Sequence, residues 1–482
     1  MTIVVIDDDP TGSQTVHSCP LLLRWDVEAL RRGLRHPSSL LFVLANTRAL
    51  PPEAAAERNR AIMAALSKAL AAEGIGGDEL LMVSRGDSTL RGHGVLEPQV
   101  LAQELGRRYG PVHATLHVPA FLPGGRTTVQ GVHLLHGVPV HTTPFARDRS
   151  FGFSTSHLDA WLEEKSDGAI PADSVLRLEG QMLDRAAAVR CGDQPDHASD
   201  GFRALLAWLE ALAHNRAVVV DAERPEQLQA LGAAVHCLQG HRRFLFRAAA
   251  SLINGLVDGG PHPLGPQPLQ GDGLVSLRRR DAAGTRLPGM VLVGSHVSLA
   301  DQQLHVLLAD PRCTGLELPV ERIARVLEGG TPDLLLPDLE REWVERLQAV
   351  LASGCTPVLF TSRGELRFGA GSAADRRRLA FGMELARLTA RLTAALVPRL
   401  GYLISKGGIT TGTLLAEGLG LEAVQLEGQL LPGLSLVRPM LPGDPTSADS
   451  AMAGLPIITF PGNLGDAGML HHTWRLLEGD QD

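Results

Sequence analysis

Several features that assign proteins to a class are missing from this sequence. Its five cysteines are scattered and include no Cys-x-x-Cys pair, so neither a disulfide framework nor a zinc site is expected. No apolar run reaches the roughly 18–20 residues that a membrane span requires. No basic stretch followed by an apolar run of signal-peptide type opens the chain. We therefore expect a cytoplasmic protein with reduced thiols and no membrane partner.

The charge and the motifs of the sequence argue against a nucleic-acid-binding protein, a metal site and a repeat protein. The net charge is −8 and the isoelectric point is about 6.1, whereas a nucleic-acid partner requires a concentrated basic surface. The histidines lack His-Glu-x-x-His or comparable spacing, so we assign no metal ligand. No internal repeat of solenoid length is present.

What the sequence does contain is an alternation of short apolar runs with amphipathic segments rich in Ala, Leu and Arg. Strands are predicted at residues 2–6, 39–46, 79–85, 114–120, 216–222, 243–249, 289–295, 356–362, 401–407 and 455–462. Helices are predicted at residues 51–72, 200–215 and 375–400. Near-continuous apolar strands between helices predict an α/β architecture, with largely parallel sheets flanked by helices.

The length of 482 residues exceeds what one hydrophobic core usually supports, so two domains are expected. The stretch 255–289 is rich in Gly and Pro, which disfavour both helix and strand. We therefore predict a first domain at residues 1–254, a linker at 255–286, and a second domain at 287–482. A ligand cleft is expected between the two domains.

Glycines follow three predicted strands in the second half. After Lys406 the chain reads Gly-Gly-Ile-Thr-Thr-Gly, which are Gly407, Gly408, Ile409, Thr410, Thr411 and Gly412. Gly294-Ser295 and the stretch Gly462-Asn463-Leu464-Gly465 end two other strands, and Ser298 is placed to cap the next helix. Adjacent glycines let backbone N–H groups converge on an anion. One such loop equally fits a tight strand-to-helix turn, but three at one sheet edge predict a nucleotide pocket.

Polar residues follow the strands of the first half in the same way. They are Asp7, Asp8, Asp9, Thr11 and Gly12, then Arg85, Asp87, Ser88, Thr89 and Arg91, then Arg126 and Thr127. Arginine forks bind carboxylates, and Ser, Thr and Asp bind hydroxyl groups, so the mixture suits a small polyhydroxylated anion. The alternative for Arg91 or Arg126 is an ion pair with an aspartate of the same sheet edge.

Taken in order, these stretches resemble the four-carbon acid sugar kinase family. The motifs that carry the resemblance are Asp8–Gly12, Arg85–Gly92, Pro119–Thr128, Asp221–Glu223, Gly294–Gln302, Gly407–Gly412 and Gly462–Gly465. The resemblance implies phosphorylation of a hydroxyl of erythronate, threonate or 3-oxo-tetronate by ATP with Mg²⁺. It places the acid sugar on the first domain and ATP on the second, in contact with Ser295 or Ser298, Gly407–Thr410 and Gly462–Asn463.

Three positions depart from that family's pattern. Arg85 replaces a lysine, Ile409 stands where an acidic residue is expected, and Phe460 replaces a lysine before the final Gly-Asn. The departures leave open a protein that binds a sugar acid or nucleotide without catalysis. A third alternative, an NAD(P)-dependent sugar-acid dehydrogenase, lacks its Gly-x-Gly-x-x-Gly turn after the first strand.

The mechanism expected from these residues is a phosphoryl transfer governed by positioning and charge neutralisation. The carboxylate of the sugar acid would pair with Arg91 and with Arg126. Asp8 by preference, or else Asp87, would accept the hydroxyl proton, and Lys406 would neutralise charge on the transferred phosphate. The partners expected are thus ATP and a sugar acid, with a homodimer as a further possibility.

Overall fold

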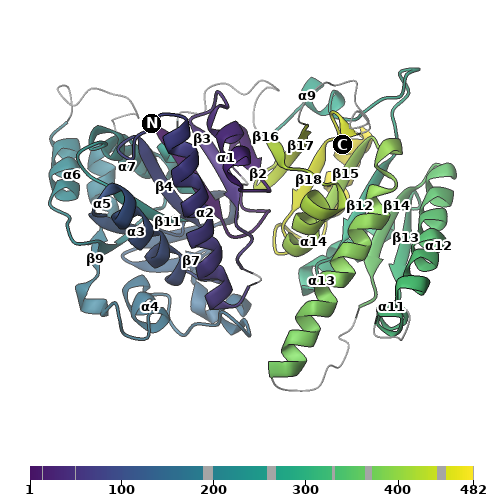
Figure 1. Cartoon of the computed structure of the whole chain (residues 1–482), viewed down its shortest axis with the longest axis horizontal. Coiled ribbons are helices and arrows are strands. Elements are labelled where there is room, and N and C mark those ends of the chain that lie inside the picture. The colour runs from purple at the N-terminus through teal and green to yellow at the C-terminus, as the bar shows by residue number, and fades with distance from the viewer. Residues whose placement is uncertain are drawn as a thin grey trace. The chain divides into compact units, whose positions relative to one another are not determined.

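The computed structural model describes residues 1–13, 15–48, 50–187, 199–257, 268–327, 332–363, 372–441 and 452–480 (Figure 1). The chain divides into two compact units, residues 1–262 (unit 1) and 263–482 (unit 2). Part of the predicted linker, residues 258–267, lies outside the described residues. In the remainder of that segment, residues 255–256 end helix α8 (Ala250–Leu256), and Asp272–Val275 form the short helix α9.

Unit 1 is built on a parallel sheet with the strand order β2-β3-β1-β4-β11-β5-β10-β9. The strands are β1 (Thr2–Asp7), β2 (His17–Leu22), β3 (Leu40–Leu44), β4 (Leu80–Arg85), β5 (Ala114–Val118), β9 (Leu176–Leu178), β10 (Arg216–Val220) and β11 (Phe244–Ala248). All residues of β3, β4, β5 and β11 are buried, as expected for strands that are covered on both faces. Because β1 lies between β3 and β4, the chain segments after these three strands meet at one sheet edge.

The helices of unit 1 form two groups of neighbours, α1 to α3 and α5 to α8. Their bounds are α1 (Val27–Leu34), α2 (Pro52–Ala72), α3 (Leu96–Tyr109), α4 (Leu158–Lys165), α5 (Gly180–Ala186), α6 (Asp200–Glu210), α7 (Pro225–Cys237) and α8 (Ala250–Leu256). The side chain of Asp26 accepts a hydrogen bond from Ala29 N and so caps α1. A small antiparallel sheet comprises β6 (Arg126–Val129), β7 (Val132–Leu135) and β8 (Val138–Pro139).

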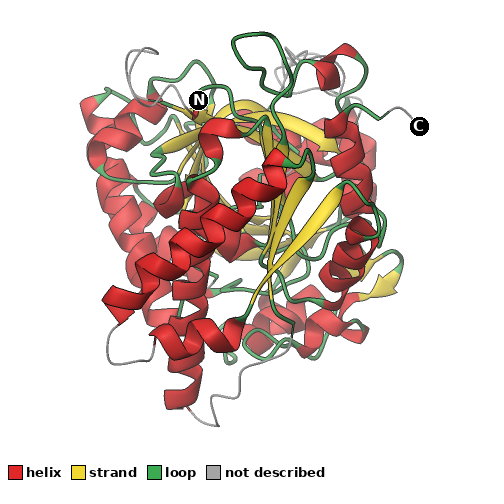
Figure 2. Cartoon of the chain, turned by 90° about the vertical axis from the view of Figure 1, so that its right-hand side faces the viewer, coloured by secondary structure: helices red, strands yellow, loops and turns green. Residues whose placement is uncertain are grey.

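Unit 2 contains a mixed sheet with the order β13-β14-β12-β15-β18-β17-β16, antiparallel only at β17 and β16. The strands are β12 (Gly289–Val293), β13 (Cys313–Leu318), β14 (Thr356–Thr361), β15 (Tyr402–Lys406), β16 (Ala423–Leu431), β17 (Leu434–Met440) and β18 (Ile457–Phe460). Its further helices are α10 (Ser298–Leu308), α11 (Val320–Leu327), α12 (Pro332–Ala352), α13 (Ser372–Ala394), α14 (Gly408–Thr413), a π-helical turn (Leu414–Gly418) and α15 (Met469–Glu478). Figure 2 distinguishes the helices, in red, from the strands, in yellow.

The α/β architecture predicted from the sequence is therefore confirmed, and every predicted strand and helix is present. The strands that were not predicted include β13, β16 and β17 of unit 2. Burial alternates along β13 and β16, so these strands are not continuous apolar runs. A second difference concerns Ser298, which is the first residue of α10 rather than its cap, because Val297 occupies the cap position.

Candidate functional site

The three consecutive aspartates lie where β1 leaves the centre of the unit 1 sheet. The strand register places Asp7 beside Leu44 of β3 and Arg85 of β4. Asp7 and Asp8 are buried, whereas Asp9 is partly exposed. The turn that follows is closed by Asp9, which accepts from Thr11 N at 2.8 Å through its side chain and from Gly12 N at 3.0 Å through its carbonyl.

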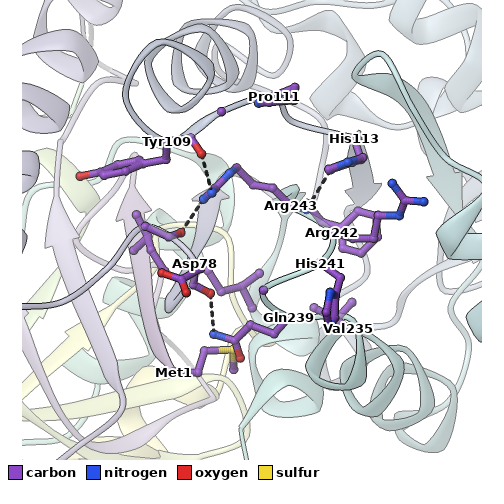
Figure 3. Close-up of a pocket in the computed structure, with 16 residues that line it drawn as sticks. Met1, Asp78, Tyr109, Pro111, His113, Val235, Gln239, His241, Arg242 and Arg243 are labelled. Carbon is purple, nitrogen blue, oxygen red and sulfur yellow. Dashed lines mark hydrogen bonds between the residues drawn. The ribbon is translucent and has the colours of Figure 1, made fainter.

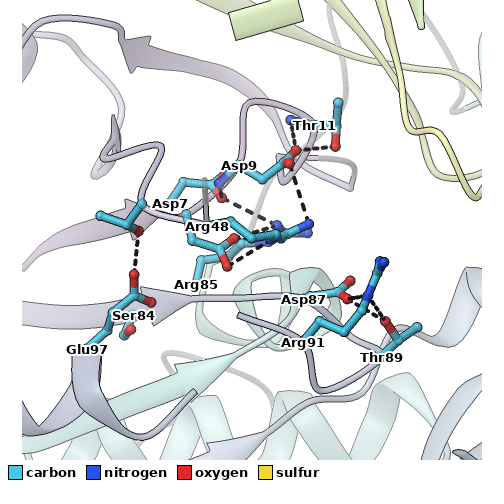
Figure 4. A network of polar contacts seen from close by, with 12 residues as sticks. Asp7, Asp9, Thr11, Arg48, Ser84, Arg85, Asp87, Thr89, Arg91 and Glu97 are labelled. Carbon is cyan, nitrogen blue, oxygen red and sulfur yellow. Dashed lines mark hydrogen bonds and ion pairs between the residues drawn. The ribbon is translucent and has the colours of Figure 1, made fainter. Parts of the chain in front are cut away.

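Guanidinium groups balance these carboxylates (Figure 4). Arg48 donates to Asp8 Oδ1 at 2.7 Å, and its Nη1 lies 3.4 Å from Asp9 Oδ2. Arg85 Nη1 lies 3.4 Å from Asp7 and 3.6 Å from Asp8. This arrangement explains how a buried strand can end in three like charges, because cations from β4 and from the loop after β3 surround them.

The carboxylates differ in their expected protonation. Burial raises the pKa of Asp7 to about 7, and Arg85 only partly opposes that rise. The Oδ2 atom of Asp7 has no hydrogen-bond partner in the described part of the chain. For Asp9 burial also favours the neutral form, but Arg48 and the Thr11 hydroxyl outweigh it and lower the pKa. The pKa values of Asp7 and Asp9 are thus shifted in opposite directions.

The loop after β4 carries the second group of predicted residues. Asp87 accepts hydrogen bonds from the Thr89 hydroxyl and from Arg91 Nε, the latter at 2.8 Å. Arg91 also lies 3.8 Å from Asp148 and 5.0 Å from the centre of the Phe145 ring. Although burial opposes it, Arg91 and Arg48 hold the pKa of Asp87 well below its usual range. The alternative of a structural ion pair therefore describes Arg91.

The same alternative does not describe Arg126, at the start of β6. Its guanidinium lies over the Phe121 ring, 5.6 Å from the ring centre. The side chain is 7% exposed, and no carboxylate or other acceptor contacts it among the described residues. Thr127, the next residue, is half-buried. In the loop after β4, the Ser88 carbonyl accepts a hydrogen bond from His133 Nε2 at 2.8 Å. Arg126 thus shares the sheet edge with Asp87, which acts on its pKa.

Sequence reasoning missed three polar residues of this edge, namely Arg48, Glu97 and Arg247. Arg247 donates to Glu97 at 2.6 Å and to the Ser84 hydroxyl at 2.9 Å, and it lies 3.9 Å from Asp8. Arg48 could have been found, because Thr47 and Arg48 directly follow the strand predicted at residues 39–46. We call the set Asp7–Thr11, Arg48, Arg85–Arg91, Glu97, Arg126 and Arg247 the charged edge.

In unit 2 the three glycine-bearing turns converge at one end of the sheet. A Cβ atom at Gly294 would lie 1.8 Å from Thr410 Oγ1, and one at Gly462 would lie 2.5 Å from Ser295 Oγ. Gly407 has a φ of +117°, which favours glycine, and its Cβ position is 3.1 Å from Ser295 N. We call residues 294–298, 407–412 and 461–465 the glycine edge. Its turns approach closely because these positions have no side chain.

Several glycine-edge residues have defined partners. The Thr411 hydroxyl contacts the Ser405 hydroxyl at 2.8 Å, so it is bound within the fold rather than capping α14. Gln303, adjacent to the predicted motif, was not singled out, yet its buried amide donates to Leu464 O and Asp466 O at 3.0 and 2.6 Å. Ile409 is 42% exposed. Gly408, Asn463, Gly465 and Ser298 are partly or fully exposed, and Gly412 is buried.

Lys406 lies at the end of β15 and is completely buried. Its Nζ atom donates to the Pro461 and Gly462 carbonyls at 2.8 and 3.3 Å and lies 4.0 Å from the centre of the Phe460 ring. Burial lowers the pKa of Lys406 to about 7. The side chain thus fixes the third glycine turn to the second.

A cavity of about 180 Å³ lies at the opposite, amino edge of the unit 1 sheet (Figure 3). Arg243 crosses it and donates to Gly77 O at 2.5 Å and Tyr109 O at 2.8 Å. Gln239 donates to Asp78 O at 3.2 Å. These polar contacts end on backbone carbonyls and join neighbouring loops, so they have a structural explanation.

Two features are absent from the described residues. In that part of the chain, no group of three or more His, Cys, Asp or Glu side chains is arranged to hold a metal ion. Within the same residues, no helix is both long and apolar enough to cross a membrane.

Models of known protein domains match both halves of the chain. A sugar-binding N-terminal domain model matches residues 3–256, and a nucleotide-binding C-terminal domain model matches residues 290–470. This pair of domains defines proteins that combine a sugar-binding with a nucleotide-binding half. The chain belongs to the four-carbon acid sugar kinase family.

Individual relatives agree with that membership. The chain is 26% identical to a D-threonate kinase of Salmonella typhimurium over 481 residues, which covers 98% of this chain and 97% of the relative. It is 27% identical over 197 residues to a D-erythronate kinase of Heliobacterium modesticaldum, covering 39% and 42% of the two chains. A solved Salmonella typhimurium LT2 structure shares the fold, with a TM-score of 0.61, 18% identity, and coverage of 97% of this chain and 98% of that one.

Proposed function

We propose that this chain is a kinase that transfers a phosphoryl group from ATP to a hydroxyl of a four-carbon sugar acid of the threonate, erythronate or 3-oxo-tetronate type. The observation that carries the proposal is the similarity to a D-threonate kinase along 98% of the chain. The chemistry of the two sheet edges supports it, because one edge carries charged and hydroxyl groups and the other carries convergent glycines.

The sugar acid is assigned to the charged edge of unit 1. Its hydroxyl groups would bind the carboxylates of Asp7–Asp9 and the polar side chains of the loop after β4, and its carboxylate would meet a guanidinium group. Gly12 is required beside Asp7, because a Cβ there would lie 2.3 Å from both carboxylate oxygens.

Asp8 is the preferred acceptor for the hydroxyl proton. Asp87 is the alternative acceptor, because its two side-chain donors, Thr89 and Arg91, both use Oδ2 and leave Oδ1 to accept. Asp8 Oδ2 has only longer contacts, 3.3 Å to Arg48 Nε and 3.9 Å to Arg247. Because phosphoryl transfer depends on positioning more than on early proton removal, a weakly basic carboxylate suffices.

The nucleotide is assigned to the glycine edge, where backbone N–H groups can approach phosphate oxygens closely. Mg²⁺ would enter with the ATP phosphates and supply charge neutralisation, and no residue is assigned to it because the described residues offer no carboxylate cluster there. Lys406 is a positioning residue in this scheme, since its ammonium group is directed at the Pro461 and Gly462 carbonyls.

The test is ADP release by the full chain incubated with ATP, Mg²⁺ and a panel of D-threonate, L-threonate, D-erythronate and 3-oxo-tetronate. Release that depends on one of these acids supports the proposal. Thermal stabilisation by an acid without any ADP would instead indicate a binding protein. Reduction of NAD(P) in the presence of the same acids would indicate a dehydrogenase, and either result contradicts the kinase assignment.

A further inference from the structure

The guanidinium groups of the charged edge are not equivalent. Most of them have a carboxylate partner within 4 Å. The pairs are Arg48 with Asp8 and Asp9, Arg85 with Asp7 and Asp8, Arg91 with Asp87 and Asp148, and Arg247 with Glu97. Arg126 is the exception in the described part of the chain, where it has neither an ion pair nor a hydrogen bond through its side chain.

This exception is costly, because Arg126 is only 7% exposed and its Nε atom is fully buried with no hydrogen-bond partner among the described residues. A buried cation without an anion loses its hydration and gains no ion pair in return. Burial accordingly lowers the pKa of Arg126. An unpaired guanidinium in such a place indicates that an anion from outside the chain completes it.

The position of the guanidinium is fixed in advance. It lies over the Phe121 ring on one side, and its Nη1 atom is so near Gly124 that a Cβ there would lie 2.0 Å away. Gly125 adopts the left-handed conformation, and Arg126 N donates to Phe121 O at 3.0 Å, which closes the loop. A planar fork held in one orientation matches the two oxygens of a carboxylate.

We propose that Arg126, rather than Arg91, binds the carboxylate of the sugar acid and gives the site its selectivity for acids over neutral polyols. This inference rests on the proposed function. The charge of Arg91 is already balanced by Asp87 at 2.8 Å and by Asp148. A neutral tetritol would leave the Arg126 guanidinium unpaired, and a site with an unpaired buried group rejects such an analogue.

The test measures binding by calorimetry, without nucleotide, for D-threonate, D-erythronate and neutral erythritol. Arg126→Gln should weaken binding of the preferred acid by about 100-fold and leave erythritol binding unchanged. Arg126→Lys should recover about tenfold of that loss, because the charge returns without the fork. Arg243→Gln is the matched control, since Arg243 also lies near an aromatic ring, 5.8 Å from the centre of Tyr109, but at the amino edge. It should keep acid affinity within about threefold.

Thermal unfolding without ligand gives an independent readout. Arg126→Met should raise the melting temperature, because it removes an unpaired buried charge, whereas Arg91→Met should lower it by leaving Asp87 unpaired. A structural role for Arg126 predicts a lower melting temperature for both variants.

These measurements distinguish the assignment of Arg126 from the proposed kinase activity. Acid affinity retained in Arg126→Gln, or lost more strongly in Arg91→Gln, overturns the assignment of Arg126 whether or not ADP is formed. Acid binding that depends on Arg126 without ADP release keeps the assignment and rejects the kinase. If none of the acids binds the wild-type chain, the carboxylate site itself is rejected.

Discussion

The carboxyl edges of the two sheets handle charge in opposite ways. At the charged edge of unit 1, most carboxylates and guanidinium groups lie within 4 Å of a group of opposite charge, and most are buried. Next to the glycine edge of unit 2 lies the buried Lys406, and its contacts are carbonyls and an aromatic ring. Under the proposed function, the charged edge binds its ligand through charged side chains. The glycine edge binds its ligand through backbone N–H groups that can approach it closely.

The largest expected effect concerns chemistry at the charged edge. Asp8→Asn should lower kcat by about a thousandfold, because the hydroxyl would lose its proton acceptor, while ATP affinity stays within about twofold. Steady-state ADP release and nucleotide calorimetry measure the two quantities. Asp173→Asn, at an exposed position of unit 1, is the control for loss of a carboxylate. Unchanged turnover in Asp8→Asn would reject the assignment of Asp8 and leave Asp87 as the proton acceptor to test.

Gly294→Ala tests the glycine edge. The new Cβ would lie 1.8 Å from Thr410 Oγ1 and 2.8 Å from Thr410 Cβ, so the turns must separate. We expect ATP binding to weaken by roughly tenfold to a hundredfold and stability to fall by about 1–3 kcal/mol. Gly382→Ala, where nothing lies within 4 Å, is the matched control and should not reduce ATP affinity. Normal ATP affinity in Gly294→Ala would show that close backbone approach is not what this edge provides.

The expected effect of Lys406 is smaller and concerns how stability depends on pH. Its folded-state pKa, about 7, is below the ordinary 10.5, so the unfolded chain binds more protons between these values and stability rises with pH there. The melting temperature of Lys406→Met should therefore rise less than that of the wild type from pH 7 to pH 10. Lys68→Met, on the exposed side of α2, should follow the wild-type slope. Parallel curves for the wild type and Lys406→Met would contradict the depressed pKa.

Asp7 should show the opposite sign at the other edge. Its folded-state pKa is raised from 3.8 to about 7, so the folded chain binds more protons in this range. The stability contributed by the protonated side chain is complete below pH 3.8 and is lost as pH rises through 7. Asp7→Asn should therefore flatten the decline in melting temperature between pH 4 and pH 7. A decline as steep as in the wild type would place the titration elsewhere.

The pattern of apolar residues explains which strands could be predicted from the sequence. Central parallel strands such as β1, β4, β12 and β15 are continuous apolar runs, so they were predicted with their helices. Strand β16 buries alternate residues and β17 ends in partly buried ones. The turn between them, with Gly433 at a φ of +75°, was overlooked.

The candidate site was predictable where its residues directly follow such strands. The aspartates after β1 and the glycines after β15 stand out for that reason. The partners of these residues depend on the order of the strands, which the sequence does not reveal. Arg247 meets the charged edge only because β11 pairs with β4, and Gln303 meets the glycine edge only because its helix packs beside residues 464–466.

The strand order of unit 1 has a consequence for how that unit acquires its function. Its charged edge draws on residues 7–11, 48, 85–91, 97, 126 and 247, brought together by parallel pairings between strands far apart in sequence. Such non-local pairings form slowly, because the chain loses the entropy of closing a long loop before the stabilising contacts are made. Helices can therefore appear well before ligand competence during refolding, and acid binding would be among the last properties to return.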